Sequence, residues 1–422
     1  MTSAAARSAA AARLPAPWTA ALASAAALGV AMGIGRFAFT PLLPMMLADG
    51  VVDLHEASWL ATANYLGYLL GAVLCTLQPW LAARMPALAI LEGPRMVRAG
   101  LAATAALTLA MALPWPAGWP TLRFLAGIAS AYVFVHTSGW CLAVLARQNA
   151  AQLGGAMYTG PGAGIVASGL VAGALVAAGQ RASTGWLVFG AMACALSVAV
   201  WRVYETPPRR ARAPAAAATA TAVTGRAHGR LEVATLAFAY GIAGFGYIVT
   251  ATFLPVIART ALPGSAWIDL FWPILGAAVI VGALLATRVR LSGDLRGLLA
   301  MGYALQAAGV VLGAWCPTPT GFALGSVLIG LPFTAITFFA MQEVRLVRPQ
   351  HVASTMGLLT ALYGIGQIVG PPFVAVVLRH SASTAAGFDL ALGIAAGSLL
   401  FGAVLFVALA WATPKRTAAP GA

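Results

Sequence analysis

Apolar runs of transmembrane length, separated by short polar intervals, cover almost the whole chain. A helix needs about 20 consecutive apolar residues to cross the hydrocarbon core of a bilayer. The pattern places the end of each run only to within about four residues. We therefore predict an all-α membrane protein with twelve transmembrane helices, at residues 18–46, 57–82, 97–114, 119–146, 153–179, 184–202, 231–258, 266–287, 297–316, 319–342, 353–379 and 386–411.

The composition agrees with this pattern. The 422 residues are 61% hydrophobic and only 8% charged, and the mean hydropathy is +0.89, which excludes a soluble domain of this length. The formal net charge of +14 would also suit a nucleic-acid-binding protein, but the arginines recur in alternate loops instead of forming one patch. This is the positive-inside pattern of membrane proteins, so we expect a lipid bilayer around the protein and no nucleic-acid partner.

Loop charge sets the predicted orientation. The first loop, residues 47–56, holds three acidic residues and no Lys or Arg, whereas the loop after the second apolar run is rich in arginine. Arginine concentrates in cytoplasmic loops. We therefore expect residues 47–56 to be external and both termini to be cytoplasmic, in a multi-pass protein of the bacterial inner membrane.

The chain also divides into two similar halves. The longest polar interval, residues 203–230, is rich in Ala, Thr, Pro and Arg and is predicted to be a cytoplasmic linker between bundles at 1–202 and 231–422. The stretch 29–44 and the stretch 240–255, 211 positions later, share a Gly-x-Gly pair and a closing Leu-Pro. This register predicts two pseudo-symmetric six-helix bundles.

Arg36 is a charged residue deep inside the first apolar run. An arginine at the centre of a membrane helix costs about 3 kcal/mol on insertion scales and therefore normally faces a cavity or a ligand. No Asp or Glu occurs in the central part of any predicted segment, so an anionic substrate would relieve this cost. The alternative is that Arg36 binds backbone carbonyls or reaches Asp269. At 100° per residue, Arg36 is predicted to share one stripe with Gly29, Gly33 and Thr40.

Short motifs make the chain resemble a known transporter family. The run from Arg123, R-F-L-A-G, and the run from Gly160, G-P-G-A-G, are similar to motifs in the fourth and fifth helices of the major facilitator superfamily. The run G-I-G-R-F-A-F-T-P-L-L-P around Arg36 is similar to the first helix of its YbfB/YjiJ-type branch. The resemblance implies a secondary transporter that works by alternating access.

One departure from the family pattern concerns the gate between helices two and three. Here the chain reads W-L-A-A-R-M-P-A-L instead of the expected Asp-Arg-x-Gly-Arg-type motif. We therefore expect other charges to latch this gate, with Arg84 or Arg95 paired to Glu92 or Glu343.

The candidate site residues fall into two groups. Polar and aromatic residues inside the predicted spans are candidates for substrate binding: Arg36, Thr40, Arg123, Ser130, Tyr158, Tyr240, Tyr247 and Gln367. For Arg123 an architectural role is an equal alternative. Small and helix-breaking residues are candidates for gating or hinge positions: Gly33, Gly35, Gly160, Pro161, Gly164, Gly244, Gly246 and Pro371.

Three classes of function were weighed. An enzyme needs a nucleophile, a carboxylate pair or a metal cluster, and no His/Cys/Asp/Glu cluster with ligand spacing occurs in the sequence. No nucleotide-binding loop occurs either, so we expect neither ATP nor another cofactor. A sensor would need a large soluble segment. The preferred hypothesis is a monomeric transporter of a small organic anion, a monocarboxylate or aromatic acid.

The main alternative is an exporter of neutral or amphiphilic compounds. Proton coupling is left open, through an acid substrate, Asp269 or His136.

Overall fold

The computed structural model describes residues 14–84, 93–150, 153–204, 230–289, 294–348 and 352–412, so most of the predicted linker lies outside the described part. The N-terminal helices are α2 (Pro17–Leu28), η1 (Gly29–Phe37), α3 (Phe39–Ala48), α4 (Leu54–Arg84), α5 (Gly93–Ala110), η3 (Pro116–Gly118), α6 (Trp119–Arg147), α7 (Gly154–Met157), α8 (Thr159–Ala177), α9 (Ala182–Trp201) and η5 (Arg202–Tyr204). The C-terminal helices are α10 (Arg230–Ala261), η6 (Ile268–Leu270), α11 (Phe271–Ala286), α12 (Arg296–Trp315), α13 (Pro319–Val347), α14 (Val352–His380) and α15 (Thr384–Ala412).

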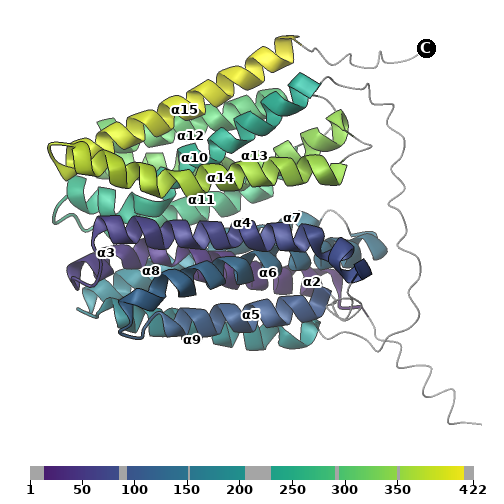
Figure 1. The fold of residues 1–422 in the computed structure, drawn as a ribbon, viewed down its shortest axis with the longest axis horizontal. Helices are drawn as coiled ribbons and strands as arrows, with labels where there is room; N and C mark the ends of the chain where they lie inside the picture. The colour runs from purple at the N-terminus through teal and green to yellow at the C-terminus, as the bar shows by residue number, and fades with distance from the viewer. Residues whose placement is uncertain are drawn as a thin grey trace, which may run out of the picture.

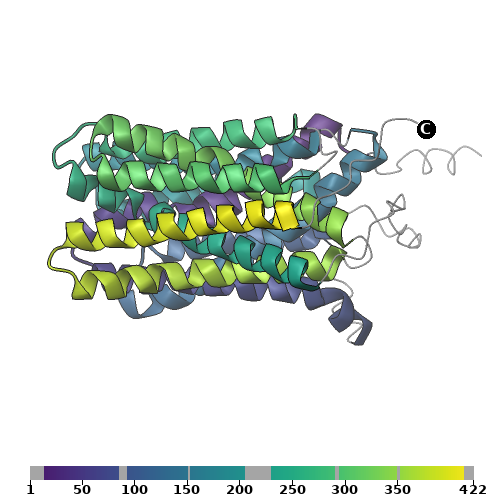
Figure 2. The ribbon, with the colours of Figure 1, turned by 90° about the horizontal axis from the view of Figure 1, so that it is seen from above.

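The long helices lie side by side along one axis, in two layers that follow the order of the chain (Figure 1). We call α2–η5 the N half and α10–α15 the C half. In the view from above, the C half lies in front of the N half, and its helices run nearly parallel to the same axis (Figure 2). We call the end where α3 leads into α4 the first-loop end, and the end where α9 finishes and α10 begins the linker end.

The predicted fold class is confirmed, with one helix that deviates from the pattern. In the described part, eleven helices are long and apolar enough to cross a membrane. The twelfth, α5, has 18 residues and carries Arg95 and Arg98 in its first turns, which lowers its hydropathy. It was predicted to reach residue 114 but ends at Ala110, because Pro114 disfavours helical backbone in the residue before it.

The first transmembrane helix is not a regular α-helix. Its middle third, η1, is a π-helix of nine residues that contains Arg36. A π-helix winds more widely than an α-helix because its hydrogen bonds join residues i and i+5, and such segments are frequent at functional sites. The predicted stripe at 100° per residue is therefore wrong in detail. Gly29 and Gly33 face α8, whereas the Arg36 side chain reaches α14.

Glycines allow the first helix of each half to touch a neighbouring backbone. A Cβ atom on Gly33 would lie 2.3 Å from the Cα of Gly164 in α8. At the corresponding position of the C half, a Cβ on Gly244 would lie 2.2 Å from the carbonyl oxygen of Tyr363 in α14. Neither contact leaves room for a side chain. The glycines predicted as gating positions therefore permit close helix packing, and a hinge role stays a prediction.

The halves meet along two continuous helix pairs, α8 with α11 and α4 with α14. The α8–α11 seam is closely packed: a Cβ on Gly162 would lie 2.8 Å from the Gly276 carbonyl oxygen, and a Cβ on Gly169 would lie 2.5 Å from the ring of Pro273. At the first-loop end α3 also packs on α10. At the linker end the short helix α7 packs against α11, where a Cβ on Gly155 would lie 1.9 Å from Thr287 Cγ2. The halves therefore touch at both ends.

Candidate functional site

Arg36 lies at the boundary between the two halves. Its side chain is only 3% exposed, and its Nη2 donates a hydrogen bond to Gln367 Oε1 of the C half at 2.6 Å. Three aromatic rings of the N half surround the guanidinium carbon, those of Phe37 at 5.4 Å, Tyr65 at 4.9 Å and Tyr68 at 4.5 Å. The faces of aromatic rings attract cations, so this shell stabilises a buried positive charge.

Gln367 joins Arg36 to its counterpart in the C half. The Gln367 Nε2 donates to the hydroxyl of Tyr247, and Tyr247 lies 211 positions after Arg36, which is the offset of the predicted repeat. One amide side chain therefore bonds to equivalent positions of the two halves. Of the predicted substrate-binding residues, the structure brings these three together: Arg36, Tyr247 and Gln367.

The charge of Arg36 has no carboxylate partner among the described residues. Its Nε is buried without a hydrogen-bond partner. Asp269, the predicted alternative partner, instead binds Arg259 at 2.5 Å. That alternative is wrong because Asp269 lies in η6, at the first-loop end. The second alternative, that Arg36 binds backbone carbonyls, has no support in the hydrogen bonds of the side chain, since its described acceptor is the Gln367 amide.

Arg123 and Ser130 hold the backbone of η1. The Arg123 Nη1 and Nη2 donate to the carbonyl oxygens of Gly35 and Arg36, both at 3.2 Å, and the Ser130 hydroxyl donates to Ala31 at 2.7 Å. A π-helix leaves its carbonyls poorly placed for regular bonding, and unsatisfied carbonyls are costly inside a membrane. These contacts support the architectural alternative for Arg123. Ser130 likewise binds a backbone carbonyl of η1.

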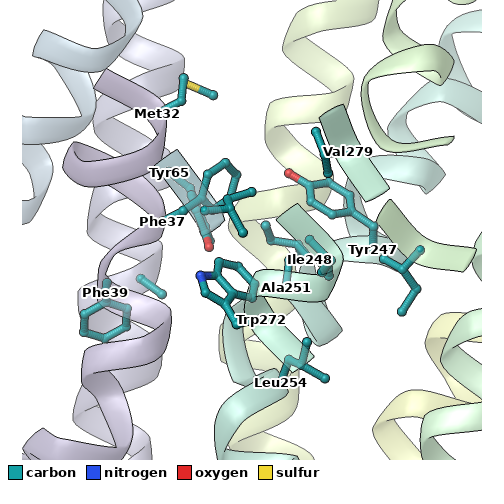
Figure 3. Packing of buried hydrophobic residues seen from close by; sticks show 14 of the residues in the cluster. Met32, Phe37, Phe39, Tyr65, Tyr247, Ile248, Ala251, Leu254, Trp272 and Val279 are labelled. Carbon is teal, nitrogen blue, oxygen red and sulfur yellow. The ribbon is translucent and has the colours of Figure 1, made fainter. Parts of the chain in front are cut away.

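Aromatic side chains fill the space between the halves. Figure 3 shows Phe37, Tyr65, Tyr247 and Trp272 gathered between the first helix and the helices of the C half. Phe37 contacts Trp272 and Phe333, with ring centroids 6.2 and 6.0 Å apart.

A column of tyrosines continues along the C half from Tyr247. Tyr363 stacks on Tyr247 at 5.7 Å and on Tyr240 at 4.7 Å. The Tyr240 hydroxyl bonds to Thr337 at 3.0 Å. Tyr240 therefore joins the site through its ring, and its hydroxyl is held within the C half.

Tyr158 and the Gly160–Pro161 pair lie at a break in the fifth transmembrane helix. The helix stops after α7 at Met157 and restarts at Thr159 as α8. Tyr158 packs against Phe134 with ring centroids 6.4 Å apart, and a Cβ on Gly160 would lie 2.0 Å from the carbonyl oxygen of Ala25. Tyr158 is not among the described contacts of Arg36, so its substrate role stays a prediction.

Proline also interrupts α14 next to the site. Pro371 and Pro372 have no N–H, so the carbonyls of Gln367 and Ile368 lack their regular donors four residues later. This weakens the helix at the residue that binds Arg36, and it gives the predicted hinge at Pro371 a physical basis.

Tyr65 and Tyr363 also belong to the site, although the sequence did not predict them. Tyr65 bonds Thr252 at 3.0 Å across the halves and lies near Arg36 together with Tyr68. The spacing of Tyr65 and Tyr68 at i, i+3, and of Tyr363 and Gln367 at i, i+4, places each pair on one helix face. These spacings are the feature of the sequence that indicates a shared helix face for each pair.

A buried charged cluster at the linker end of the C half was also missed. Arg296 is fully buried and binds Asp294 at 2.6 Å and Glu232 at 3.2 Å, with Glu343 at 3.9 Å. It ties α10, α12 and α13 together. Glu343 of the predicted gate latch thus lies near Arg296 of its own half, and Glu92 lies outside the described residues. The latch through Arg84 or Arg95 stays a prediction.

Comparisons with known proteins agree with this architecture. Crystal structures of the nucleoside transporter NupG superpose with TM-scores of 0.69 for a single-site mutant and 0.67 for NupG itself. They cover 92% and 93% of this chain, and 99% and 98% of their own, at 14% identity. At this identity the likeness shows the fold alone. No curated protein matches the sequence.

The described helices define a multi-pass membrane protein, and the family match makes it a transporter and not an enzyme. The chain belongs to the family described as "Uncharacterised MFS-type transporter YbfB", which it matches over residues 28–407. It is therefore a secondary transporter of the major facilitator type, and it acts on a small molecule.

Proposed function

We propose that the transported molecule is a small organic anion, and that Arg36 binds its carboxylate. The observation that carries this proposal is the buried guanidinium of Arg36, which no carboxylate neutralises among the described residues. Removing a cation from water is costly, and a neutral amide compensates less of that cost than an anion does. A bound carboxylate therefore gains its affinity from a charge that the protein leaves unneutralised.

The arrangement of the halves supports alternating access at this site. Arg36 and Gln367 belong to different halves, so their hydrogen bond would have to break or change if the halves moved relative to each other.

Proton coupling through a protein side chain finds no carrier in the Arg36 network among the described residues. The two protein groups considered as carriers have other partners. Asp269 is bound to Arg259, and His136 stacks on Tyr132 at 5.8 Å and lies 3.9 Å from the Cys75 thiol. Neither is bonded to the Arg36 network.

A second candidate function is export of neutral or amphiphilic compounds. It is favoured by the aromatic cluster beside Arg36, in which Tyr240, Tyr363 and Tyr247 stack in a column and Phe333 meets Tyr247 edge-on. Such surfaces bind planar apolar groups without needing charge. In this reading the Gln367 amide is the permanent partner of Arg36.

A ligand-stability measurement separates the two candidates. Purified protein is heated with benzoate or benzamide, and with lactate or lactamide, so that each pair differs chiefly in charge. A ligand that binds only the folded state raises the midpoint of unfolding. The anion proposal expects stabilisation by at least one carboxylate and none by its amide. Equal stabilisation by both members of each pair would favour the neutral-solute candidate.

A further inference from the structure

The side chain of Gln367 holds the edge of Arg36 that an anion would need. We infer that Gln367 competes with the substrate's carboxylate for Arg36, and that its displacement links substrate binding to the release of α14 from η1. This inference rests on the proposed function. It assigns Gln367 a role in substrate binding: the Gln367 side chain must move away from Arg36 when the substrate binds.

The surroundings of Arg36 restrict how an anion can reach the guanidinium. Phe37, Tyr65 and Tyr68 lie within 5.4 Å of its central carbon. The remaining polar contact is the bond from Nη2 to Gln367. A carboxylate binds arginine through the N–H groups at the edge of its plane, most strongly with two parallel hydrogen bonds. Both two-pronged arrangements, Nε with Nη2 and Nη1 with Nη2, include the nitrogen that binds Gln367. The incoming anion and the Gln367 amide therefore compete at Nη2.

The exchange favours the anion. Gln367 offers Arg36 one neutral carbonyl oxygen. The Arg36–Gln367 bond has one charged partner, whereas a carboxylate adds a second charge and can accept two parallel hydrogen bonds from a guanidinium. Gln367 would also lose its bond to Tyr247 when it moves, and the Tyr247 hydroxyl would then become available to the substrate.

The helix that carries Gln367 is suited to movement at this residue. Its carbonyl and that of Ile368 lack regular donors because of Pro371 and Pro372. Gly366 is the preceding residue and contacts the backbone of α10. A segment with fewer internal hydrogen bonds opens at a lower free energy than its surroundings.

Loss of the Gln367 bond would weaken the join between the halves. The described side-chain hydrogen bonds near the site that cross between the halves are four: Arg36 to Gln367, Thr40 to Ala251, Tyr65 to Thr252, and Trp272 to Ser168. Removal of one of them by the substrate lowers the free energy needed to separate α3 and η1 from the C half. Binding would then favour opening at the first-loop end.

The affinity test uses benzoate and two substitutions of Gln367. Gln367→Ala removes the competitor and is expected to bind benzoate roughly tenfold more tightly, because a bond to a charged group is lost from the free state. Gln367→Glu supplies a permanent carboxylate and is expected to weaken benzoate binding by about tenfold or more. The matched control is Gln306→Ala, since Gln306 is equally buried but bonds Ile329 within the C half. Unchanged or weaker binding by Gln367→Ala, with Gln367→Glu binding like the parent, would overturn the inference.

A distance measurement tests the link to opening without requiring any ligand. Spin labels are placed at Val51→Cys and Ala266→Cys, two exposed positions at the first-loop end of the two halves, after the exposed Cys194 and Cys316 are replaced by Ser. Gln367→Ala is expected to shift the distribution to longer distances and Gln367→Glu to shorter ones. Gln306→Ala should match the parent.

The two measurements separate failure of this inference from failure of the proposed function. If benzoate and lactate do not bind the parent but Gln367→Ala lengthens the distance, the anion proposal fails and Gln367 is still shown to join the halves. If the anions bind but the distances of both Gln367 variants equal those of the parent, the proposed function stands and the link to opening is refuted.

Discussion

Thr40 and Ala251 are counterparts in the two halves, 211 residues apart, and they are hydrogen-bonded to each other. The Thr40 hydroxyl donates to the Ala251 carbonyl at 2.9 Å. That carbonyl lacks its regular helical donor, because the residue four positions later is Pro255. Inside a membrane such a freed carbonyl needs a partner, and a threonine of a neighbouring helix can supply it. The pseudo-twofold axis of the molecule therefore passes close to this bond.

Removal of this hydroxyl should loosen the first-loop end. Thr40→Val keeps the shape of the side chain but leaves the Ala251 carbonyl without the bond, so we expect a destabilisation of about 1–3 kcal/mol. The control is Thr108→Val, because the Thr108 hydroxyl bonds a carbonyl of its own helix. Thermal unfolding in detergent measures both variants. Equal midpoints for the two would contradict the prediction.

Substitutions of Arg36 should show how far anion binding depends on its charge and how far on the planar geometry of its guanidinium. Arg36→Ala is expected to abolish binding of the anion while the protein stays folded, since Arg36 bonds no carboxylate that would be orphaned. Arg36→Lys should recover part of the affinity, because the charge remains although the planar fork is lost. Binding isotherms with benzoate test this. An Arg36→Ala variant with the parent's affinity would eliminate the anion proposal.

Arg123 should behave differently from Arg36. Arg123→Ala frees the carbonyls of Gly35 and Arg36 inside the membrane, and each lost bond to a charged group is worth about 1.5–3 kcal/mol. We expect a clear loss of thermal stability and a secondary loss of transport. A stable Arg123→Ala protein with lost anion binding would instead assign Arg123 to the substrate.

Close packing of the first helix predicts a strong effect at Gly33. Gly33→Ala places its Cβ against the Cα of Gly164, and overpacking of this kind costs about 1–3 kcal/mol. Gly393→Ala in α15 serves as the comparison, because nothing lies within 4 Å of its added Cβ and alanine is the better helix former. Gly33→Ala should unfold at a lower temperature than the parent, and Gly393→Ala should not.

The orientation in the membrane can be tested through the linker. Loop charges place residues 203–230 in the cytoplasm. A single cysteine at Ala218 should resist an impermeant maleimide in intact cells, whereas one at Val51 should react. Labelling of position 218 from outside would reverse the predicted topology.

We could predict the twelve helices, the 211-residue offset and individual polar positions of the site from the sequence, because hydropathy and repeats are local patterns. It did not show that Gln367 joins Arg36 to Tyr247, since that meeting depends on how α14 packs against the first helix. The π-helix at Gly29–Phe37 was missed because its run of glycines and apolar residues reads equally well as a regular helix. The Arg296 cluster was missed because its carboxylates come from distant segments.

The α8–α11 seam has a consequence for leakage. Gly162 and Gly276 bring two backbones from opposite halves so close that neither accepts a methyl group. Helices in such contact pivot more readily than they part, so widening at one end of the seam narrows the other. A passage open at both ends at once would require this seam to separate. We therefore expect the Gly162–Gly276 contact to limit the leakage of ions between the halves, and a bulky replacement at Gly276, which would force the two backbones apart, to increase that leakage.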